Sequence, residues 1–192
     1  MLDQRDWYTA GLDHIWLPYA QMKTAPAPLP VVRTEGTRIH LADGRELVDG
    51  IASWWTACHG YNHPHIREAV QRLLDVMPHV MFGGLVLEQP LTLARRLSNM
   101  LPGDLDRVFF TDSGSVSVEV AMKMAIQYWL NHGEKRDTFV YFRGGYHGDT
   151  LGTMAVSDFE TGIHQKFGDI LHKHLCAALP ESPETDAELV AL

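Results

Sequence analysis

The chain has 192 residues and a formal net charge of −8, with 45% hydrophobic and 21% charged residues, an ordinary composition for a globular protein that buries a core. The acidic balance and the lack of a basic stripe argue against a nucleic-acid partner, and no apolar run is long enough for a membrane span. Cys58 and Cys176 lie far apart and the N-terminus lacks signal-peptide character, so we expect reduced thiols in a cytoplasmic protein.

The first 30 residues predict an irregular arm, because they hold many aromatic residues and prolines and show little periodicity. An apolar arm of this kind needs another surface to cover it, and a partner subunit would provide one. Further along, Asp43-Gly44 stands between the β-forming runs Thr37–Leu41 and Glu46–Val48, which is typical of a β-hairpin.

Two helices are predicted next. Pro64 suits the first position of a helix, with Asn62 or His63 before it as the N-cap, and apolar residues then recur at helical spacing as far as Met77. A second helix is predicted over Leu91–Leu101, where Pro-Gly follows and ends it.

A strand, a polar turn and a helix follow one another between Arg107 and Trp129. The strand is predicted over Val108–Thr111, and the helix from Val116, with an inward stripe at residues 117, 121, 124, 125 and 128. The positive end of the helix dipole, two hydroxyls and a glycine without a Cβ meet at the turn, and such a turn suits a phosphate or carboxylate. The candidate anion-binding residues are Ser113, Gly114 and Ser115.

The alternative is that Ser115 is only an N-cap and Gly114 only a turn residue. A capping box would need Glu or Gln three residues after the cap, but Val118 stands there and Glu119 comes one residue later. Capping therefore does not fully explain this turn. The turn is neither a Walker loop nor a G-x-G-x-x-G fingerprint, which disfavours nucleoside triphosphates and dinucleotides.

A second strand over Thr138–Phe142 leads into the glycine-rich turn of residues 143–150. The order strand, helix, strand predicts an α/β fold, whose ligands bind beyond the carboxyl ends of the strands, where both polar turns would lie. Tyr146 sits in the second turn, where a bulky side chain needs a partner, and Trp54 is another aromatic residue near the strand ends. An aromatic face beside a phosphate cradle suits a planar phosphorylated cofactor.

The sequence disfavours two other kinds of site, a metal centre and a serine-hydrolase active site. Histidines at 59, 63 and 65, and at 172 and 174, have ligand-like spacings, yet Gly60 and Pro64 interrupt any shared helix face, so no metal is expected. The serines at 113 and 115 lack the G-x-S-x-G elbow of a hydrolase.

Several motifs together resemble the class III aminotransferases, which depend on pyridoxal 5′-phosphate. The run His14–Tyr19 and the run His79–Gly84 make the branch of biotin synthesis the nearest match. The motifs that carry the wider resemblance are Ser53–Trp55, His59–Pro64, His79–Gly84, Asp112–Trp129 and Gly145–Thr150.

The resemblance implies a type I pyridoxal-phosphate transferase fold and a homodimer. It implies that Ser113, Gly114 and Ser115 hold the cofactor phosphate and that Tyr146 stacks on the pyridine ring. The substrate-contacting residues that it implies are Tyr19, Trp54 and Asp149. It places residues 1–60 in the small domain, as an arm and hairpin, and residues 61–192 in the first part of the large cofactor-binding domain.

In that branch S-adenosylmethionine would donate the amino group and 8-amino-7-oxononanoate would accept it. The family's Schiff-base lysine, the aspartate that pairs with the pyridinium and the carboxylate-binding arginine fall in a C-terminal part that these residues do not match. We therefore expect an incomplete fold with no catalytic residue in this chain, inactive by itself. Two alternatives stay open: another class III transaminase acting on ω-amino acids, and a non-catalytic subunit.

Overall fold

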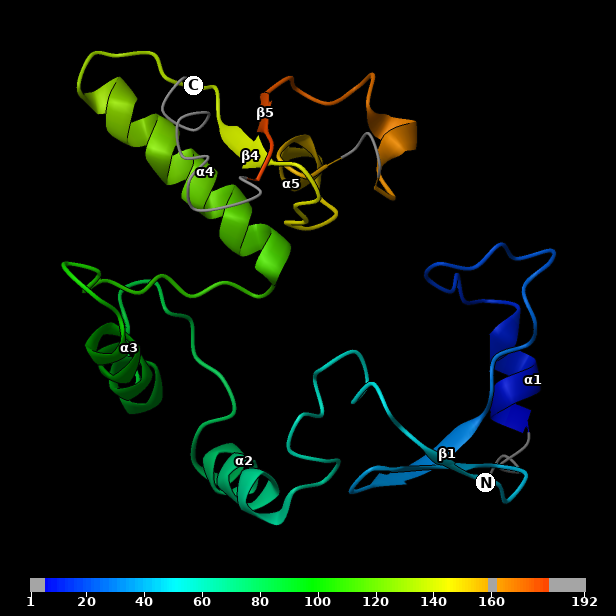
Figure 1. The fold of residues 1–192 in the computed structure, drawn as a ribbon. Coiled ribbons are helices and arrows are strands. Elements are labelled where there is room, and N and C mark those ends of the chain that lie inside the picture. The colour runs from blue at the N-terminus through cyan, green and yellow to red at the C-terminus, as the bar shows by residue number, and fades with distance from the viewer. Residues whose placement is uncertain (1–5, 159–161, 180–192) are drawn as a thin grey trace. The chain divides into compact units, whose positions relative to one another are not determined.

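The computed structural model describes residues 6–158 and 162–179, which form two compact units, Met1–Val86 and Leu87–Leu192. The first unit contains α1 (Asp6–Leu12), β1 (Val31–Glu35), β2 (Arg38–Leu41), β3 (Glu46–Val48) and α2 (Pro64–Val76). The second contains α3 (Glu88–Met100), α4 (Gly114–Asn131), β4 (Val140–Phe142), α5 (Leu151–Ala155), a 3₁₀ turn (Gln165–Phe167) and β5 (Leu175–Ala177). The chain contains both helices and strands, with β1 to β3 in one run and α2 to α4 in another, so the predicted α/β class is confirmed (Figure 1).

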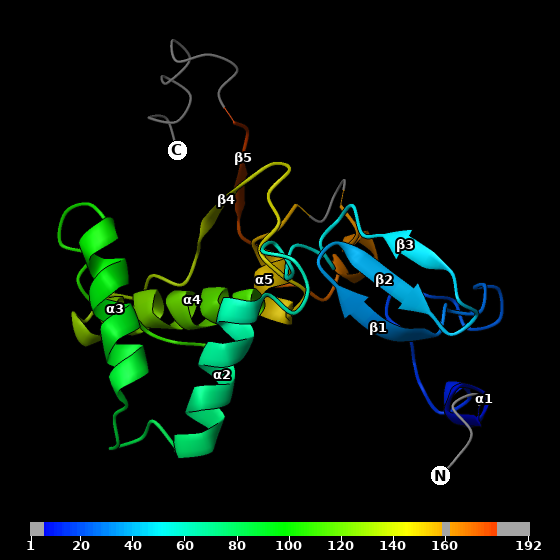
Figure 2. The same ribbon diagram turned by 90° about the horizontal axis from the view of Figure 1, so that it is seen from below.

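The first unit is built on a three-stranded antiparallel sheet in the order β1-β2-β3, whose strands lie side by side in Figure 2. The predicted hairpin is confirmed as β2 and β3, and Gly44 adopts the positive φ of 88° that its tight turn requires. Strand β1 was not expected. It pairs Arg33 with His40 and Glu35 with Arg38, and its signal was the β-branched run that opens with Val31.

The arm is less irregular than predicted, because α1 forms within it. The Tyr8 hydroxyl of α1 donates a 2.7 Å hydrogen bond to the carbonyl of Pro28, which ties the start of the arm to its end. Helix α2 begins at Pro64, as predicted, with His63 at the N-cap. The cap side chain makes no hydrogen bond, so the fixed φ of Pro64 is the feature that marks this helix start.

Helix α4 begins two residues earlier than predicted, and its N-cap is Ser113 rather than Ser115. The Ser113 Oγ accepts a 3.2 Å hydrogen bond from the N–H of Val116. The predicted inward stripe is mostly wrong, since residues 117, 121, 124 and 128 are exposed and only Ala125 is half-buried. The half-buried face contains Val118, Met122 and Ile126 instead, because α4 packs against α5 rather than on a sheet.

The strand predicted over Val108–Thr111 is wrong. A strand needs a neighbouring strand to satisfy its N–H and C=O groups, and within residues 6–158 and 162–179 this segment has none. The second predicted strand does form, as the short β4, because β5 pairs with it in parallel. Tyr141 of β4 and Ala177 of β5 are buried, and Met154, Ala155 and Leu171 form a small core cluster in the same unit.

Two expectations from composition can be compared directly with the structure. Cys58 and Cys176 are both free thiols. In the part of the chain that the structure describes, no helix is both long and apolar enough to cross a bilayer. The sequence also predicts an acidic turn over residues 180–186 that leads into a short helix, and this segment lies outside the described residues.

His174 couples the β4–β5 region to pH. Its Nδ1 accepts a 3.3 Å hydrogen bond from the N–H of Phe139, and its ring lies edge-on to the Phe139 ring. Burial, and next the nearby His172, lower the pKa of His174, while Asp137 opposes them. Below the unfolded-state pKa of about 6.5, the unfolded chain therefore binds a proton at His174 more readily than the folded chain does. The contribution of neutral His174 to the free energy of unfolding is complete above that pH and is lost as the pH falls toward the folded-state pKa.

We expect the thermal midpoint of the wild type to fall between pH 7.5 and 5.5, and His174→Asn to reduce that fall by removing the titrating group. Differential scanning calorimetry at both pH values measures it. The exposed His14, replaced by asparagine, is the control and should keep the wild-type slope. An unchanged slope in His174→Asn would contradict the assignment.

Candidate functional site

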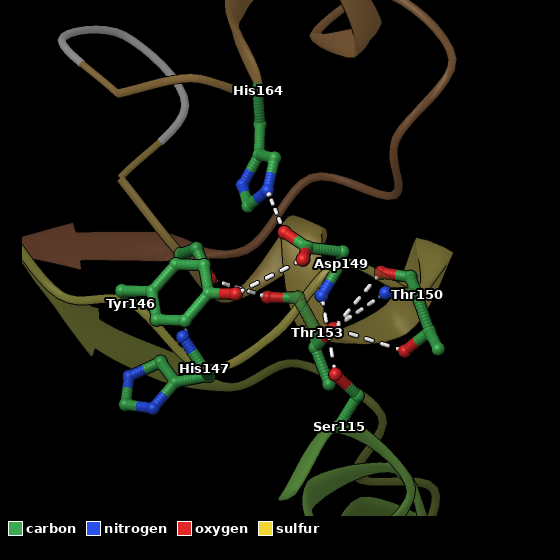
Figure 3. Close-up of polar contacts among 8 residues, drawn as sticks. Ser115, Tyr146, His147, Asp149, Thr150, Thr153 and His164 are labelled. Carbon is green, nitrogen blue, oxygen red and sulfur yellow. Dashed lines mark hydrogen bonds and ion pairs between the residues drawn. The ribbon is translucent and has the colours of Figure 1, made fainter. Parts of the chain in front are cut away.

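The N-terminus of α4 lies directly against the loop of residues 144–150 (Figure 3). The Ser115 Oγ accepts a 3.2 Å hydrogen bond from the N–H of Asp149. Gly148, with a φ of 130°, passes so close that a Cβ built on it would lie 2.7 Å from the Cβ of Ser115. The two polar turns that the sequence placed at one edge of the fold are therefore in contact.

The side chains of Tyr146, Asp149 and His164 contact one another beside Ser115. The Tyr146 hydroxyl donates a 3.0 Å hydrogen bond to Oδ2 of Asp149, and Nε2 of His164 lies 2.8 Å from Oδ1 of the same carboxylate. The rings of Tyr146 and His164 stack, with centroids 5.9 Å apart and planes 23° apart. Tyr146 nevertheless keeps 60% of its surface exposed, so a ligand can still reach its ring while Asp149 and His164 contact it.

Glu119 of α4 secures the end of the same loop. Its Oε1 accepts hydrogen bonds from the Thr150 hydroxyl at 2.6 Å and from the N–H of Gly152 at 2.9 Å. Thr150 also exchanges hydrogen bonds with Thr153 at the start of α5. Glu119 does not stand at the capping-box position of its own helix, and the structure shows that it binds the first turn of α5 instead.

The opposite side of the loop is fastened to the residues that follow α5. The carboxylate of Asp158 accepts from the N–H of Gly144 at 2.9 Å, and the Ser157 Oγ accepts from the N–H of His147 at 3.0 Å. Both side chains belong to buried residues. The sequence reasoning missed them together with Glu119, Thr153 and His164. For the four of them that follow Gly152, the available signal was the set of polar residues in the segment 153–164.

The start of α4 retains donors for an anion. Within the described residues, the N–H groups of Gly114 and Ser115 have no hydrogen-bond partner, and apart from the chain neighbours and adjoining helix backbone no atom lies within 4 Å of a Cβ built on Gly114. These donors sit at the positive end of an 18-residue helix. The hydroxyls of Ser113 and Ser115 accept protein hydrogen bonds, and each can still donate one.

Tyr19 and Trp54 lie together in the first unit. Their rings stack with centroids 5.6 Å apart and planes 21° apart, and both side chains are largely exposed. Trp54 belongs to four consecutive non-glycine residues with positive φ, from Ala52 to Trp55, a conformation that costs about 1–2 kcal/mol per residue. Strain of this kind concentrates at functional sites.

Asp49 holds this left-handed turn. Its carboxylate accepts from the N–H groups of Ile51 and Ser53 and from the Tyr61 hydroxyl. The bond from Tyr61 is the main cause that lowers the pKa of Asp49, and it raises the pKa of Tyr61. The turn that carries Trp54 is thus fixed by an ionised carboxylate.

Among residues 6–158 and 162–179, no group of three or more His, Cys, Asp or Glu side chains is arranged to hold a metal ion.

Comparison with known proteins adds a family to this geometry. The sequence profile described as Aminotransferase class-III matches residues 19–190. The adenosylmethionine-8-amino-7-oxononanoate aminotransferase of Buchnera aphidicola subsp. Acyrthosiphon pisum is 44% identical over 88% of this chain and 40% of its own length. The protein of the same name in Synechococcus elongatus is 48% identical over 76% of this chain and 34% of its own length.

A solved structure agrees with the profile. The adenosylmethionine-8-amino-7-oxononanoate aminotransferase of Methanocaldococcus jannaschii superposes with a TM-score of 0.86 and 31% identity, over 99% of this chain and 44% of that one. The predicted fold class is therefore confirmed for the part that is present. The chain spans about two fifths of the length of these relatives.

Proposed function

The chain belongs to the class III aminotransferase family, and we propose that it supplies part of a pyridoxal 5′-phosphate-dependent active site. We propose the reaction of biotin biosynthesis, in which S-adenosylmethionine donates an amino group and 8-amino-7-oxononanoate accepts it. The names of the relatives at 44% and 48% identity support this choice. The observation that carries the cofactor assignment is the pair of N–H groups at Gly114 and Ser115, which have no partner among the described residues, together with the exposed ring of Tyr146 in the adjoining loop.

The residues present fit this cofactor. The N–H groups of Gly114 and Ser115, with the hydroxyls of Ser113 and Ser115, would hold the phosphate dianion, and the open space at Gly114 admits it. Tyr146 would offer its ring face to the pyridine. Pyridoxal phosphate, when bound, supplies the electron sink through which an amino group is transferred.

Substrate contacts are proposed for Tyr19, Trp54 and Asp149. The stacked pair of Tyr19 and Trp54 offers an exposed aromatic surface, and Asp149 offers a carboxylate that is already oriented by two side chains. No turnover is expected from the 192 residues alone, because the resemblance assigns the Schiff base to none of their lysines. We further propose a cytoplasmic homodimer, and a boundary near residue 60 between the small and the large domain.

A second candidate keeps the cofactor and changes the substrates. An (S)-enantioselective ω-transaminase from Thermomicrobium roseum superposes with a TM-score of 0.79 at 27% identity, over 92% of this chain and 41% of that one. Turnover of the complete protein with S-adenosylmethionine against alanine as amino donor separates the two. A non-catalytic role would show as no turnover with either donor.

The substitution Gly114→Ala tests the anion site by ligand binding and stability, so the test needs no catalytic activity. The unfolding free energy should change by no more than about 0.5 kcal/mol, because the new methyl meets open space at the first turn of a helix. Affinity for pyridoxal 5′-phosphate should fall roughly tenfold or more, because the methyl stands where the phosphate must approach. Urea denaturation and calorimetric titration measure the two effects.

Two controls sharpen this test. Pyridoxal, which lacks the phosphate, should bind wild type and variant alike. Gly11→Ala, in α1 and also in open space, should leave affinity unchanged. A wild-type chain that binds pyridoxal phosphate no better than pyridoxal would overturn the assignment, as would equal phosphate affinity in wild type and Gly114→Ala.

A further inference from the structure

His164 is a buried titratable residue to which the proposed function gives no role. Only 4% of its surface is exposed, and among the residues that the structure describes it is the one buried histidine. Its Nε2 lies 2.8 Å from Oδ1 of Asp149. An ionised carboxylate only accepts hydrogen bonds, so Nε2 carries the hydrogen and donates it.

His164 interacts with Tyr146 in two ways, through Asp149 and by direct ring stacking. Asp149, held by His164 at one oxygen, accepts the Tyr146 hydroxyl at the other. The imidazole also stacks on the phenol ring. The hydrogen bond holds the phenol hydroxyl, and the stacked imidazole, with its plane 23° from that of the phenol, favours one orientation of the exposed ring.

The same group is tied to the start of α4. The main-chain N–H of Asp149 donates to Ser115 Oγ, while the side chain of Asp149 joins His164 and Tyr146 (Figure 3). Asp149 therefore links the plane of the Tyr146 ring to the helix terminus that carries the free N–H groups.

We propose that His164 is a positioning residue. Its N–H bond to Asp149 and its stacked ring hold the face of Tyr146 at the orientation in which the phenol receives a planar ring ligand beside Gly114 and Ser115. The identity of the ring ligand rests on the proposed function, which takes it to be pyridoxal 5′-phosphate. The orientation of Tyr146 by His164 concerns only residues of this chain.

The first measurement needs no ligand and no variant. A long-range ¹H–¹⁵N spectrum of the full wild-type chain should show the His164 hydrogen on Nε2. The ring protons of Tyr146 should show nuclear Overhauser contacts with the ring protons of His164, because the two rings stack. A hydrogen on Nδ1 alone, or the absence of contacts between the two rings, would overturn the proposal.

Two variants separate the two contacts. His164→Phe keeps a ring against Tyr146 and removes the donor, whereas His164→Gln keeps an N–H donor and removes the ring. Each should weaken binding of pyridoxal 5′-phosphate by roughly two- to tenfold, the range expected for one aromatic or hydrogen-bonded contact. Both should leave the affinity for inorganic phosphate unchanged, because phosphate uses the N–H groups of α4 and not the ring.

The outcomes are distinguishable. If His164 had only a structural role, both variants would lose affinity for pyridoxal 5′-phosphate and for inorganic phosphate equally, which would overturn the proposal. Unchanged affinity for pyridoxal 5′-phosphate in both variants would also overturn it. The same substitutions at the exposed His65 of α2 are controls and should change neither affinity. A wild-type chain that binds neither ligand would contradict the proposed function, and the ligand-free spectra would then decide the fixing of Tyr146 alone.

Discussion

Replacing Gly148 by alanine is expected to destabilise the Leu87–Leu192 unit by about 3 kcal/mol. The new Cβ would lie 2.7 Å from the Cβ and 2.9 Å from the Cα of Ser115, and the φ of 130° is one that L-residues rarely adopt. Both penalties arise together, because the loop cannot lift away without losing the hydrogen bond from Asp149 to Ser115. Amide hydrogen exchange in α4 and α5 reports the loss for this unit specifically.

Gly144→Ala is the matched control for this prediction. Gly144 has a φ of 76°, yet no atom lies within 4 Å of a Cβ built on it. Only the backbone penalty of about 1–2 kcal/mol applies there. Equal losses in the two variants would mean that the contact between the loop and Ser115 contributes nothing.

Replacing Glu119 by alanine is expected to cost roughly 2–3 kcal/mol, also in the Leu87–Leu192 unit. The change removes the acceptor for the Thr150 hydroxyl and the Gly152 N–H, both half-buried, and leaves the hydroxyl with Thr153 alone and the N–H without this acceptor. Glu119→Gln keeps an oxygen acceptor and should lose less than half as much. Hydrogen exchange of the α5 amides measures both variants.

Glu134→Ala serves as the reference for a surface carboxylate. Glu134 pairs with Arg136 in an exposed ion pair, which contributes about 0–1 kcal/mol. If Glu119→Ala costs no more than Glu134→Ala, Glu119 does not anchor the loop. Because the loop carries Tyr146, the destabilised Glu119→Ala chain should also bind pyridoxal phosphate more weakly.

The sequence by itself determined the features that depend on neighbouring residues. Asp43-Gly44 predicted a hairpin, Pro64 marked the start of α2, and the polar turn before α4 was found within two residues of its true position. Turn and cap chemistry act over three or four residues, so they can be read locally. The family was also predictable, because its motifs are short continuous runs, and the match over residues 19–190 confirms it.

Only the tertiary structure decided the features that join distant residues. Strand β4 exists because β5, more than thirty residues later, pairs with it, while Val108–Thr111 remains without such a partner among the described residues. Glu119 and His164 looked unremarkable in the sequence, and their roles appear only where Thr150, Gly152 and Asp149 meet them. The physical reason is that hydrogen bonds and burial depend on proximity in space, which no local pattern encodes.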